Sequence, residues 1–217
     1  MKKTRFALLA LFALSFSFLS LSTLYAQEDE ARTFVDRVAT KLKGIGSLEA
    51  QFSTTAYSGQ EVVGEASGKL TLKGRKFKLV SPAMQQWFDG TTLWALEAGS
   101  DEIYVSKPTR TELQQINPYN FIDLYKQGFI LSTASDTYQN KPVTEVHMLS
   151  KSTKNPIQEI YITVGQDLLP ACIRFRNGKK NWTKIMITSL RTGIHVSDSD
   201  FQLDTARYPN YEVIDLR

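Results

Sequence analysis

Alternation of apolar and polar residues with a period of two is the feature that most constrains what this chain can fold into. In its first run, Leu48, Ala50 and Phe52 alternate with polar neighbours. Such alternation gives a strand one apolar face and one polar face, as in an antiparallel sheet. The same period recurs at 64–73, 76–79, 143–149, 160–164, 171–176 and 185–187. The chain is therefore predicted to be mainly β, with roughly ten strands whose apolar faces are covered by side chains or by a ligand.

Turn signals connect these strands. Asp89-Gly90 lies between two apolar pairs and predicts a hairpin, and Asn177-Gly178 predicts a second one. The stretch 211–216 is expected to add a strand at an edge. These short connections leave no linker or charge block that would divide the chain.

Two helices interrupt the period of two. Ala31, Val35, Val38 and Leu42 follow helical spacing and predict an amphipathic helix over 28–43. Asn117-Pro118 has the form of an N-cap followed by proline in the first turn, and it predicts a short, very apolar helix that ends before Gly128.

The N-terminal segment has the pattern of a secretory signal peptide. Three basic residues near the start precede an uncharged run over 6–26, and Ala26 precedes an acidic stretch. We expect cleavage near Ala26 to leave a single domain over 27–217 in the periplasm; the alternative is an uncleaved membrane anchor. Without the three cations the formal net charge falls from +4 to +1, so the basicity does not indicate a nucleic-acid partner.

Residues for catalysis or metal binding are scarce. One Cys and two His exclude a four-ligand Cys/His metal site and an intrachain disulfide. No G-x-S-x-G, P-loop or G-x-G-x-x-G motif occurs. His147 and His195 are expected at the surface, and Asp198 and Asp200 in a turn. Cys172 is expected to be inert, although the arginines on its strand face could lower its pKa. We therefore expect no enzyme activity, metal or cofactor.

The order of several short motifs resembles one known family. An amphipathic helix is followed by Leu48-Glu49-Ala50-Gln51-Phe52, by Gly68-Lys69-Leu70-Thr71-Leu72-Lys73 and by Asp89-Gly90-Thr91-Thr92-Leu93-Trp94. Asn117-Pro118 and a closing Asp200-Phe201-Gln202-Leu203-Asp204 complete the order. This arrangement resembles the outer-membrane lipoprotein carrier proteins of the LolA family over essentially all of 27–217.

The resemblance implies an open, highly curved antiparallel sheet, an incomplete β-barrel, with two to three helices across its concave apolar face. It implies a periplasmic carrier that binds lipoprotein acyl chains and moves them from the inner to the outer membrane. The implied partners are acylated lipoproteins, an inner-membrane lipoprotein-releasing ABC transporter and an outer-membrane acceptor, and the protein is expected to be a monomer. A carrier of another amphiphile such as a glycolipid, a lipoprotein-sensing regulatory module and an outer-membrane receptor remain as alternatives.

The apolar strand face is expected to line the cavity for the acyl chains. Its predicted members are Phe52, Leu70, Leu72, Phe77, Leu79, Ile160, Ile162, Ile173, Phe175, Ile185 and Ile187. Trp87 and Trp94 are added to this set, although the sequence of their hairpin does not decide which face of the sheet they occupy.

A lid and a latch complete the predicted site. The lid is the short helix with Pro118, Phe121, Ile122, Leu124 and Tyr125. The resemblance implies a latching Arg directly after the G-x-L-x-x-K strand, whereas here Gly74 intervenes before Arg75. Arg75 therefore either acts as the latch with a shift of one residue or is a solvated turn residue.

Overall fold

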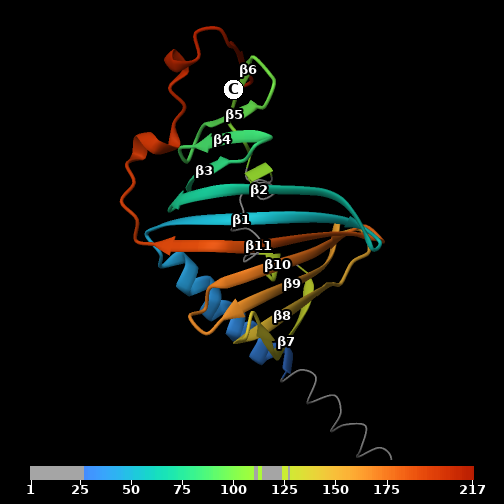
Figure 1. Cartoon of the computed structure of the whole chain (residues 1–217). Helices are drawn as coiled ribbons and strands as arrows, with labels where there is room; N and C mark the ends of the chain where they lie inside the picture. Colours follow the sequence, from blue (N-terminus) through green and yellow to red (C-terminus); the bar gives the residue numbers. More distant parts are fainter. Residues whose placement is uncertain (1–26, 110–111, 114–123, 127) are drawn as a thin grey trace, which may run out of the picture.

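The computed structural model describes residues 27–109, 112–113, 124–126 and 128–217. A helix over 27–43 leads into twelve strands and two short 3-10 helices (Figure 1). In chain order these are β1 (Ser47–Ser58), β2 (Glu61–Lys73), β3 (Lys76–Val80), β4 (Met84–Phe88), β5 (Leu93–Glu97), β6 (Glu102–Ser106), β7 (Phe129–Tyr138), β8 (Lys141–Ser150), β9 (Ile157–Gly165), β10 (Pro170–Asn177), β11 (Asn181–Thr192), η1 (Asp198–Phe201), η2 (Thr205–Arg207) and β12 (Glu212–Asp215).

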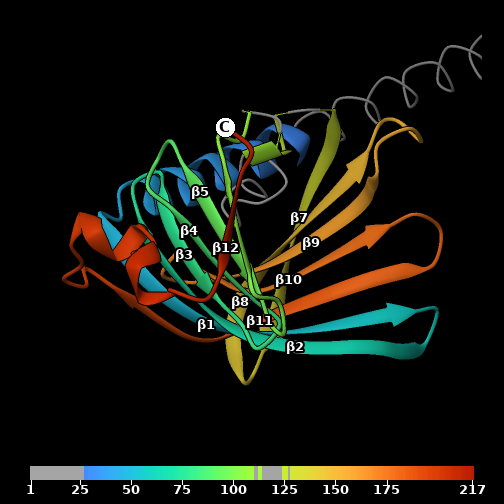
Figure 2. The same cartoon turned by 90° about the horizontal axis from the view of Figure 1, so that it is seen from above.

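All twelve strands form one sheet, in the order β12-β6-β5-β4-β3-β2-β1-β11-β10-β9-β8-β7. Neighbours are antiparallel except β12 and β6, which are parallel. β12 and β7 are the two edges and do not pair with each other, so the described sheet is curved but open (Figures 1 and 2). The predicted open, mainly β fold is confirmed, and so is the edge strand within 211–216.

The expectation of two to three helices is not matched. The described residues contain one long α-helix, over 27–43, where a helix over 28–43 was predicted. Most of the second expected helix, including Pro118, Phe121 and Ile122, lies outside the described residues.

Both predicted hairpins are present. At the β4–β5 turn the Asp89 carboxylate accepts hydrogen bonds from the backbone N–H groups of Thr91 and Thr92, at 2.9 and 2.8 Å. Gly90 takes the positive φ of 102° that this turn requires. Asn177 pairs with Asn181 across the second turn. These local signals were sufficient because turn chemistry does not depend on distant contacts.

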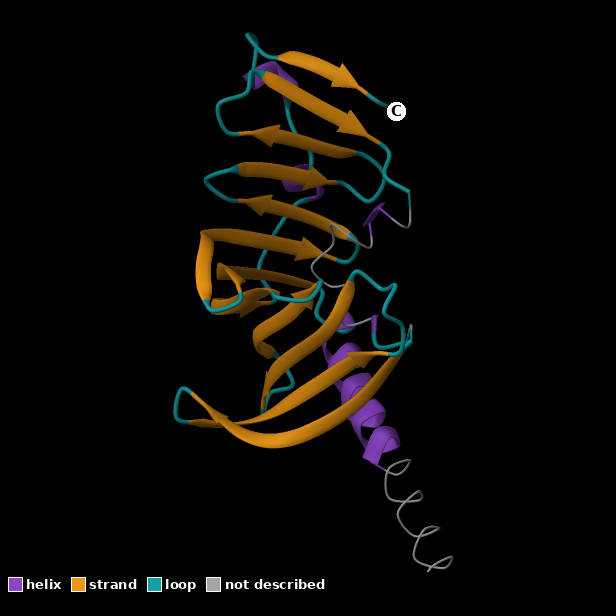
Figure 3. Ribbon diagram, turned by 90° about the vertical axis from the view of Figure 1, so that its right-hand side faces the viewer, coloured by secondary structure: helices purple, strands orange, loops and turns teal. Residues whose placement is uncertain are grey.

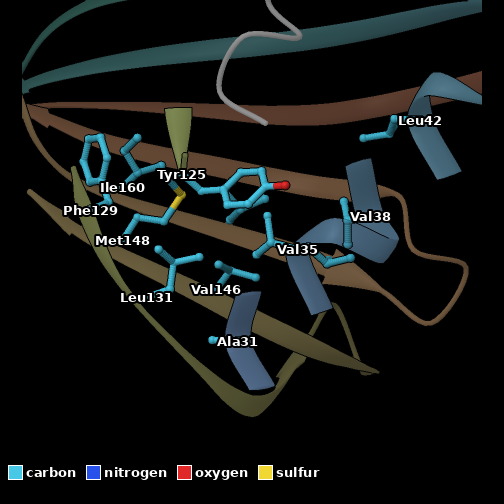
Figure 4. Close-up of a cluster of buried hydrophobic side chains, with 12 residues drawn as sticks. Ala31, Val35, Val38, Leu42, Tyr125, Phe129, Leu131, Val146, Met148 and Ile160 are labelled. Carbon is cyan, nitrogen blue, oxygen red and sulfur yellow. The ribbon is translucent and has the colours of Figure 1, made fainter. Parts of the chain in front are cut away.

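The helix over 27–43 covers the inner face of the sheet, which we define as the face of Leu70 and Ile162. Its apolar side packs on strands β7 to β9 (Figure 4). Polar contacts fix the same helix: Arg32 Nη2 donates to the Phe129 carbonyl at 3.2 Å, and the Tyr125 hydroxyl donates to the Asp36 carboxylate. The helix is thereby held at the end of the sheet where β7 begins.

The C-terminal segment over 193–211 covers the opposite, outer face of the sheet, before β12 joins its edge. Figure 3 shows its short 3-10 helices beside the upper strands of the sheet. Asp198 joins it to the β2–β3 hairpin, with Lys76 Nζ at 2.8 Å and Lys73 Nζ at 3.0 Å from its carboxylate oxygens. Hydrogen bonds from the same two lysines lower the pKa of Asp198. Asp200 caps η1, so both aspartates are turn residues as expected.

Phe201 anchors this segment and gives a test of it. Its side chain is fully buried, so we expect Phe201→Ala to lower the free energy of unfolding by about 3–5 kcal/mol, the usual cost of deleting a buried ring. Urea denaturation measures this. Leu216→Ala is the control, because Leu216 is 64% exposed and its removal should change little. Equal stability of Phe201→Ala and wild type would show that the segment does not contribute to the core.

Candidate functional site: an apolar cavity under the N-terminal helix

An apolar cavity of about 90 Å³ lies between the helix over 27–43 and the inner face of the sheet. The helix contributes three residues and strands β1, β2, β8, β9, β10 and β11 the rest. The lining residues are Val35, Val38, Leu42, Leu48, Ala50, Leu70, Leu72, Val146, Ile162, Val164, Pro170, Ile173, Ile187 and Leu190. A wall without a charged or hydrogen-bonding side chain suits the aliphatic part of a ligand.

Strand register brings these residues together. Ile185, Ile173, Ile162 and Val146 lie side by side on four consecutive strands. A second row joins Leu79 and Leu70 to Ala50. Because side chains alternate between faces with a period of two, each row repeats the same face across the sheet. The cavity is therefore a direct result of the alternation in the sequence.

The structure places the predicted residues in three groups. Leu70, Leu72, Ile162, Ile173 and Ile187 line the cavity. The residues of the second group lie on the same inner face but do not line the cavity. Five of them pack in the adjoining cores: Phe52, Phe77, Leu79, Ile160 and Phe175. The sixth, Ile185, lies beside Ile173. The two tryptophans form the third group.

Trp87 and Trp94 lie on the outer face, which corrects their inclusion in the cavity. Phe88, and not Trp87, pairs with Phe77 on the inner side, where their ring centroids are 5.4 Å apart. Trp87 pairs with Lys78 and Trp94. Both tryptophans pack in a separate core beneath the C-terminal segment, with Leu96, Ile103, Val105, Leu203, Tyr208 and Tyr211.

Several lining residues were missed from the sequence. Leu48 and Ala50 lie on the same strand face as Phe52. Val146 and Val164 lie on the inner faces of β8 and β9, where they alternate with outward-facing residues. The alternation could have identified these four. Leu190 and Pro170 carry no such signal, because a register shift separates each of them from the rest of the alternation on its strand.

The predicted lid and latch are described only in part. Leu124 packs against the core under the helix, and Tyr125 is buried in it. The other three lid residues lie outside the described residues. Arg75 is exposed in the two-residue turn between β2 and β3 and makes no hydrogen bond or ion pair within the described ranges. The latch role stays a prediction.

The outer face carries a polar and aromatic cluster that the sequence did not reveal. His147 stacks on Tyr161, with ring centroids 4.4 Å apart, and its Nε2 lies 2.9 Å from Glu159. Arg176 also donates to Glu159 at 3.0 Å. Burial alone would raise the pKa of Glu159, but hydrogen bonds from Tyr161, Arg176 and His147 outweigh it and lower that pKa. The partners of His147 come from a neighbouring strand, so no spacing in the sequence predicted these contacts.

Cys172 is buried on this outer face, with 2% of its surface exposed, and in hydrogen-bond contact with Tyr138. Burial raises the pKa of its thiol, and this outweighs the lowering by Lys184 and Arg174. Arg174 thus lowers this pKa as suggested, but burial has the larger effect and the net shift is upward. Arg174 forms an ion pair with Glu145, and its Nη2 lies 2.6 Å from a carboxylate oxygen of that residue. A protonated, buried thiol is unreactive, which agrees with the expected inertness.

Other classes of site were searched for in the same ranges. Among the described residues, no group of three or more His, Cys, Asp or Glu lies close enough to hold a metal ion. No helix in the described part of the chain is long and apolar enough to cross a membrane.

Known structures share this architecture at low sequence identity. The crystal structure of Mycobacterium tuberculosis lipoprotein LppX matches with a TM-score of 0.51 and 9% identity, over 78% of this chain and 100% of that one. This likeness shows the fold. A LolA superfamily protein from Nitrosomonas europaea matches with a TM-score of 0.44 and 7% identity, over 80% and 98%. The Pseudomonas aeruginosa MucA/MucB complex matches with 0.46 and 12%, over 81% of this chain and 62% of that one.

The family is shown by sequence. No curated protein matches significantly. Residues 21–179, most of the chain, match the family described as outer membrane lipoprotein carrier protein LolA. The open curved sheet and the apolar cavity under its helix agree with this match. This chain belongs to the LolA family of outer membrane lipoprotein carrier proteins.

Proposed function

We propose that the protein is a periplasmic carrier that binds the acyl chains of lipoproteins in the cavity under the helix over 27–43 and moves them from the inner to the outer membrane. The observation that carries this proposal is the cavity wall, which consists of apolar side chains from the helix and six strands. Family membership supports lipoproteins as the cargo. The proposed partners are acylated lipoproteins, a lipoprotein-releasing ABC transporter of the inner membrane and an outer-membrane acceptor.

The energetics of carriage explain why such a wall is needed. Burial of one CH₂ group contributes about 0.8 kcal/mol, so an acyl chain of about 16 carbons costs on the order of 12 kcal/mol to hold in water. A carrier that uses no ATP must offset this with apolar surface of its own. The cavity wall offers that surface without a polar group that would lose its hydration.

The size of the cavity indicates that it must open for cargo. A volume of about 90 Å³ is well below the ~300–1,000 Å³ of typical ligand pockets, so the structure corresponds to a closed form. Loading then requires the helix over 27–43 to move away from the sheet. Such a movement would break the Arg32–Phe129 and Tyr125–Asp36 hydrogen bonds and the ion pair of Glu28 with Lys151, 3.9 Å apart.

Another amphiphile is the second candidate cargo, because an apolar wall recognises the chain and not the headgroup. Mass spectrometry of lipid that co-purifies with the protein from a periplasmic extract separates the two. Recovery of acylated lipoproteins supports the proposal. Recovery of a glycolipid or another lipid alone would replace lipoproteins as the cargo while keeping the cavity as the binding site.

A charge in the cavity wall should abolish loading. Ile187 lines the cavity and is only half-buried, so the variant Ile187→Asp should still fold. It should bind a fluorescent diacyl lipopeptide at least tenfold more weakly, which corresponds to a loss of about 1.4 kcal/mol in binding free energy. Val213→Asp is the matched control, because Val213 is 47% exposed on β12, outside the cavity. Thermal melting verifies the fold of both variants. Equal binding by the two would exclude the cavity as the acyl site.

Arg75 is tested in the release step. If Arg75 latches the lid, Arg75→Leu should accept lipoprotein but release it poorly, since the closed empty form that drives release loses a bond of about 1.5–3 kcal/mol. The measurement is transfer from purified carrier to outer-membrane vesicles. Normal transfer would identify Arg75 as a solvated turn residue and would leave the proposed carriage unaffected.

Cys172 should be dispensable. Its buried thiol faces away from the cavity, so Cys172→Ser should retain both the fold and the transfer of lipoprotein in the same assay. At neutral pH the wild-type thiol should also react slowly with iodoacetamide, because its raised pKa keeps it protonated. Loss of release in Cys172→Ser would show that the thiol has a function.

A further inference from the structure

The first half of β2 has an edge that no strand covers in the described part of the chain. β1 pairs with β2 over its full length, Glu61 to Lys73. β3 pairs only with Lys69 to Lys73. Residues 61–68 therefore present a row of main-chain N–H and C=O groups without a strand partner. Figure 2 shows this half of the hairpin extending beyond β3.

This free edge has only part of the usual protection, a β-bulge at Val63 and two glutamates. Natural edge strands are blunted by Lys, Pro or shortness. Residues 61–68 contain neither Lys nor Pro, and their only charges are Glu61 and Glu65. Val62 and Val63 are 50% and 60% exposed, although β-branched residues favour a covered strand. The edge is therefore suited to accept another strand.

The two terminal edges of the sheet are less suitable. β12 has four residues and is flanked by the charges of Glu212 and Asp215. At the β7 edge, the Phe129 carbonyl already accepts a hydrogen bond from Arg32, and Phe129 and Leu131 pack beneath the helix over 27–43. Each edge has an exposed β-branched residue, but Val213 lies on a strand of only four residues, and Ile130 follows Phe129, whose carbonyl is already engaged by Arg32.

The free edge begins beside the cavity. Leu70 and Leu72, which line the cavity, follow it on the same strand. Between them and the tip, the inner face of β2 carries only Gly64, Ala66 and Gly68. A side chain at Gly68 would meet the Phe52 ring at 2.7 Å and the Val80 carbonyl at 2.9 Å. The Phe52 ring of β1 therefore packs over Gly68 at the start of the edge, and β2 itself contributes no large side chain there.

Strand geometry indicates which residues face outward. Lys73 and Lys76 close the two-residue turn to β3, so the main chain of Lys73 faces β3. Because this orientation alternates, Lys69, Ser67 and Glu65 direct their N–H and C=O groups to the same side. At Ser67 and Glu65 that side is unoccupied by any described strand.

We propose that the edge over 61–68 binds, by strand addition, the extended polypeptide tether that follows the acylated residue of a lipoprotein. This inference rests on the proposed function, because the acyl chains in the cavity bring the tether to this end of β2. Strand addition uses main-chain hydrogen bonds, which recognise an extended peptide without requiring one sequence. A carrier with such an edge holds the tether of its cargo as well as the lipid.

The test compares two synthetic ligands: a diacylated cysteine amide, and the same lipid with a tether of eight uncharged residues. Wild type should bind the tethered lipopeptide about tenfold more tightly, as expected for one or two net hydrogen bonds. Ser67→Pro removes one outward N–H and should lose most of this gain while binding the untethered lipid normally. Ser67→Ala keeps the N–H and is the matched control.

A second measurement does not depend on the folding of the proline variant. Hydrogen exchange of the wild-type protein should show protection of the Ser67 and Glu65 amides by the tethered ligand and not by the untethered one. Equal affinity for the two ligands, or equal behaviour of Ser67→Pro and Ser67→Ala, would overturn the proposal. So would a lipid-free dimer that Ser67→Pro converts to a monomer, since the edge would then pair with a second copy. If wild type binds neither ligand, the proposed carriage fails together with this inference.

Discussion

Contact between the helix over 27–43 and the inner face of the sheet is the interaction on which the rest of the structure depends. A curved sheet with an apolar concave face cannot leave that face in water. Ala31, Val35, Val38 and Leu42 cover it over β7 to β9, and hydrogen bonds from Arg32 and Tyr125 fix the position of the helix. The helix does not fill the concavity completely. The space left over is the cavity.

The outer face is stabilised differently in the two halves of the sheet. Over β4 to β6 the C-terminal segment forms a separate apolar core through Leu203, Tyr208 and Tyr211, and Asp198 joins the segment to two lysines of the β2–β3 hairpin. Over β8 to β11 the outer face is covered by ion pairs and stacked rings, such as Arg174 with Glu145 and His147 with Tyr161. The outer face thus provides rigidity, and the chemistry proposed for cargo belongs to the inner face.

An open sheet serves a carrier better than a closed one. A cavity bounded by one helix can enlarge when that helix moves, whereas closure between β12 and β7 would fix its volume. Openness has a cost, because it leaves unpaired edges. Here β12 is short, the start of β7 is engaged by the helix, and the free half of β2 begins beside the cavity. The proposed tether site makes use of this exposed edge of β2.

The sequence by itself determined the elements and most of their faces. Alternation identified the inner face of residues such as Leu70 and Ile162, helical spacing identified a helix over 28–43, and turn chemistry identified the hairpins at Asp89 and Asn177. These features could be predicted because they depend on neighbours in the chain. β7 was missed because its second half, Ser132 to Asp136, is polar apart from Ala134 and lacks the alternation.

Tertiary structure decided what local patterns leave open. Trp87 and Phe88 are adjacent and both apolar, so the sequence does not show which of them faces the cavity. The C-terminal segment, more than 100 residues later in the chain, covers Trp87 on the outer face. Likewise, Ile162 lines the cavity while Phe77, of the same inner face, is packed against Phe88. The difference depends on where the helix leaves space. Parity is a property of a strand, but a cavity is a property of how separate elements pack, and alternation carries no information about that packing.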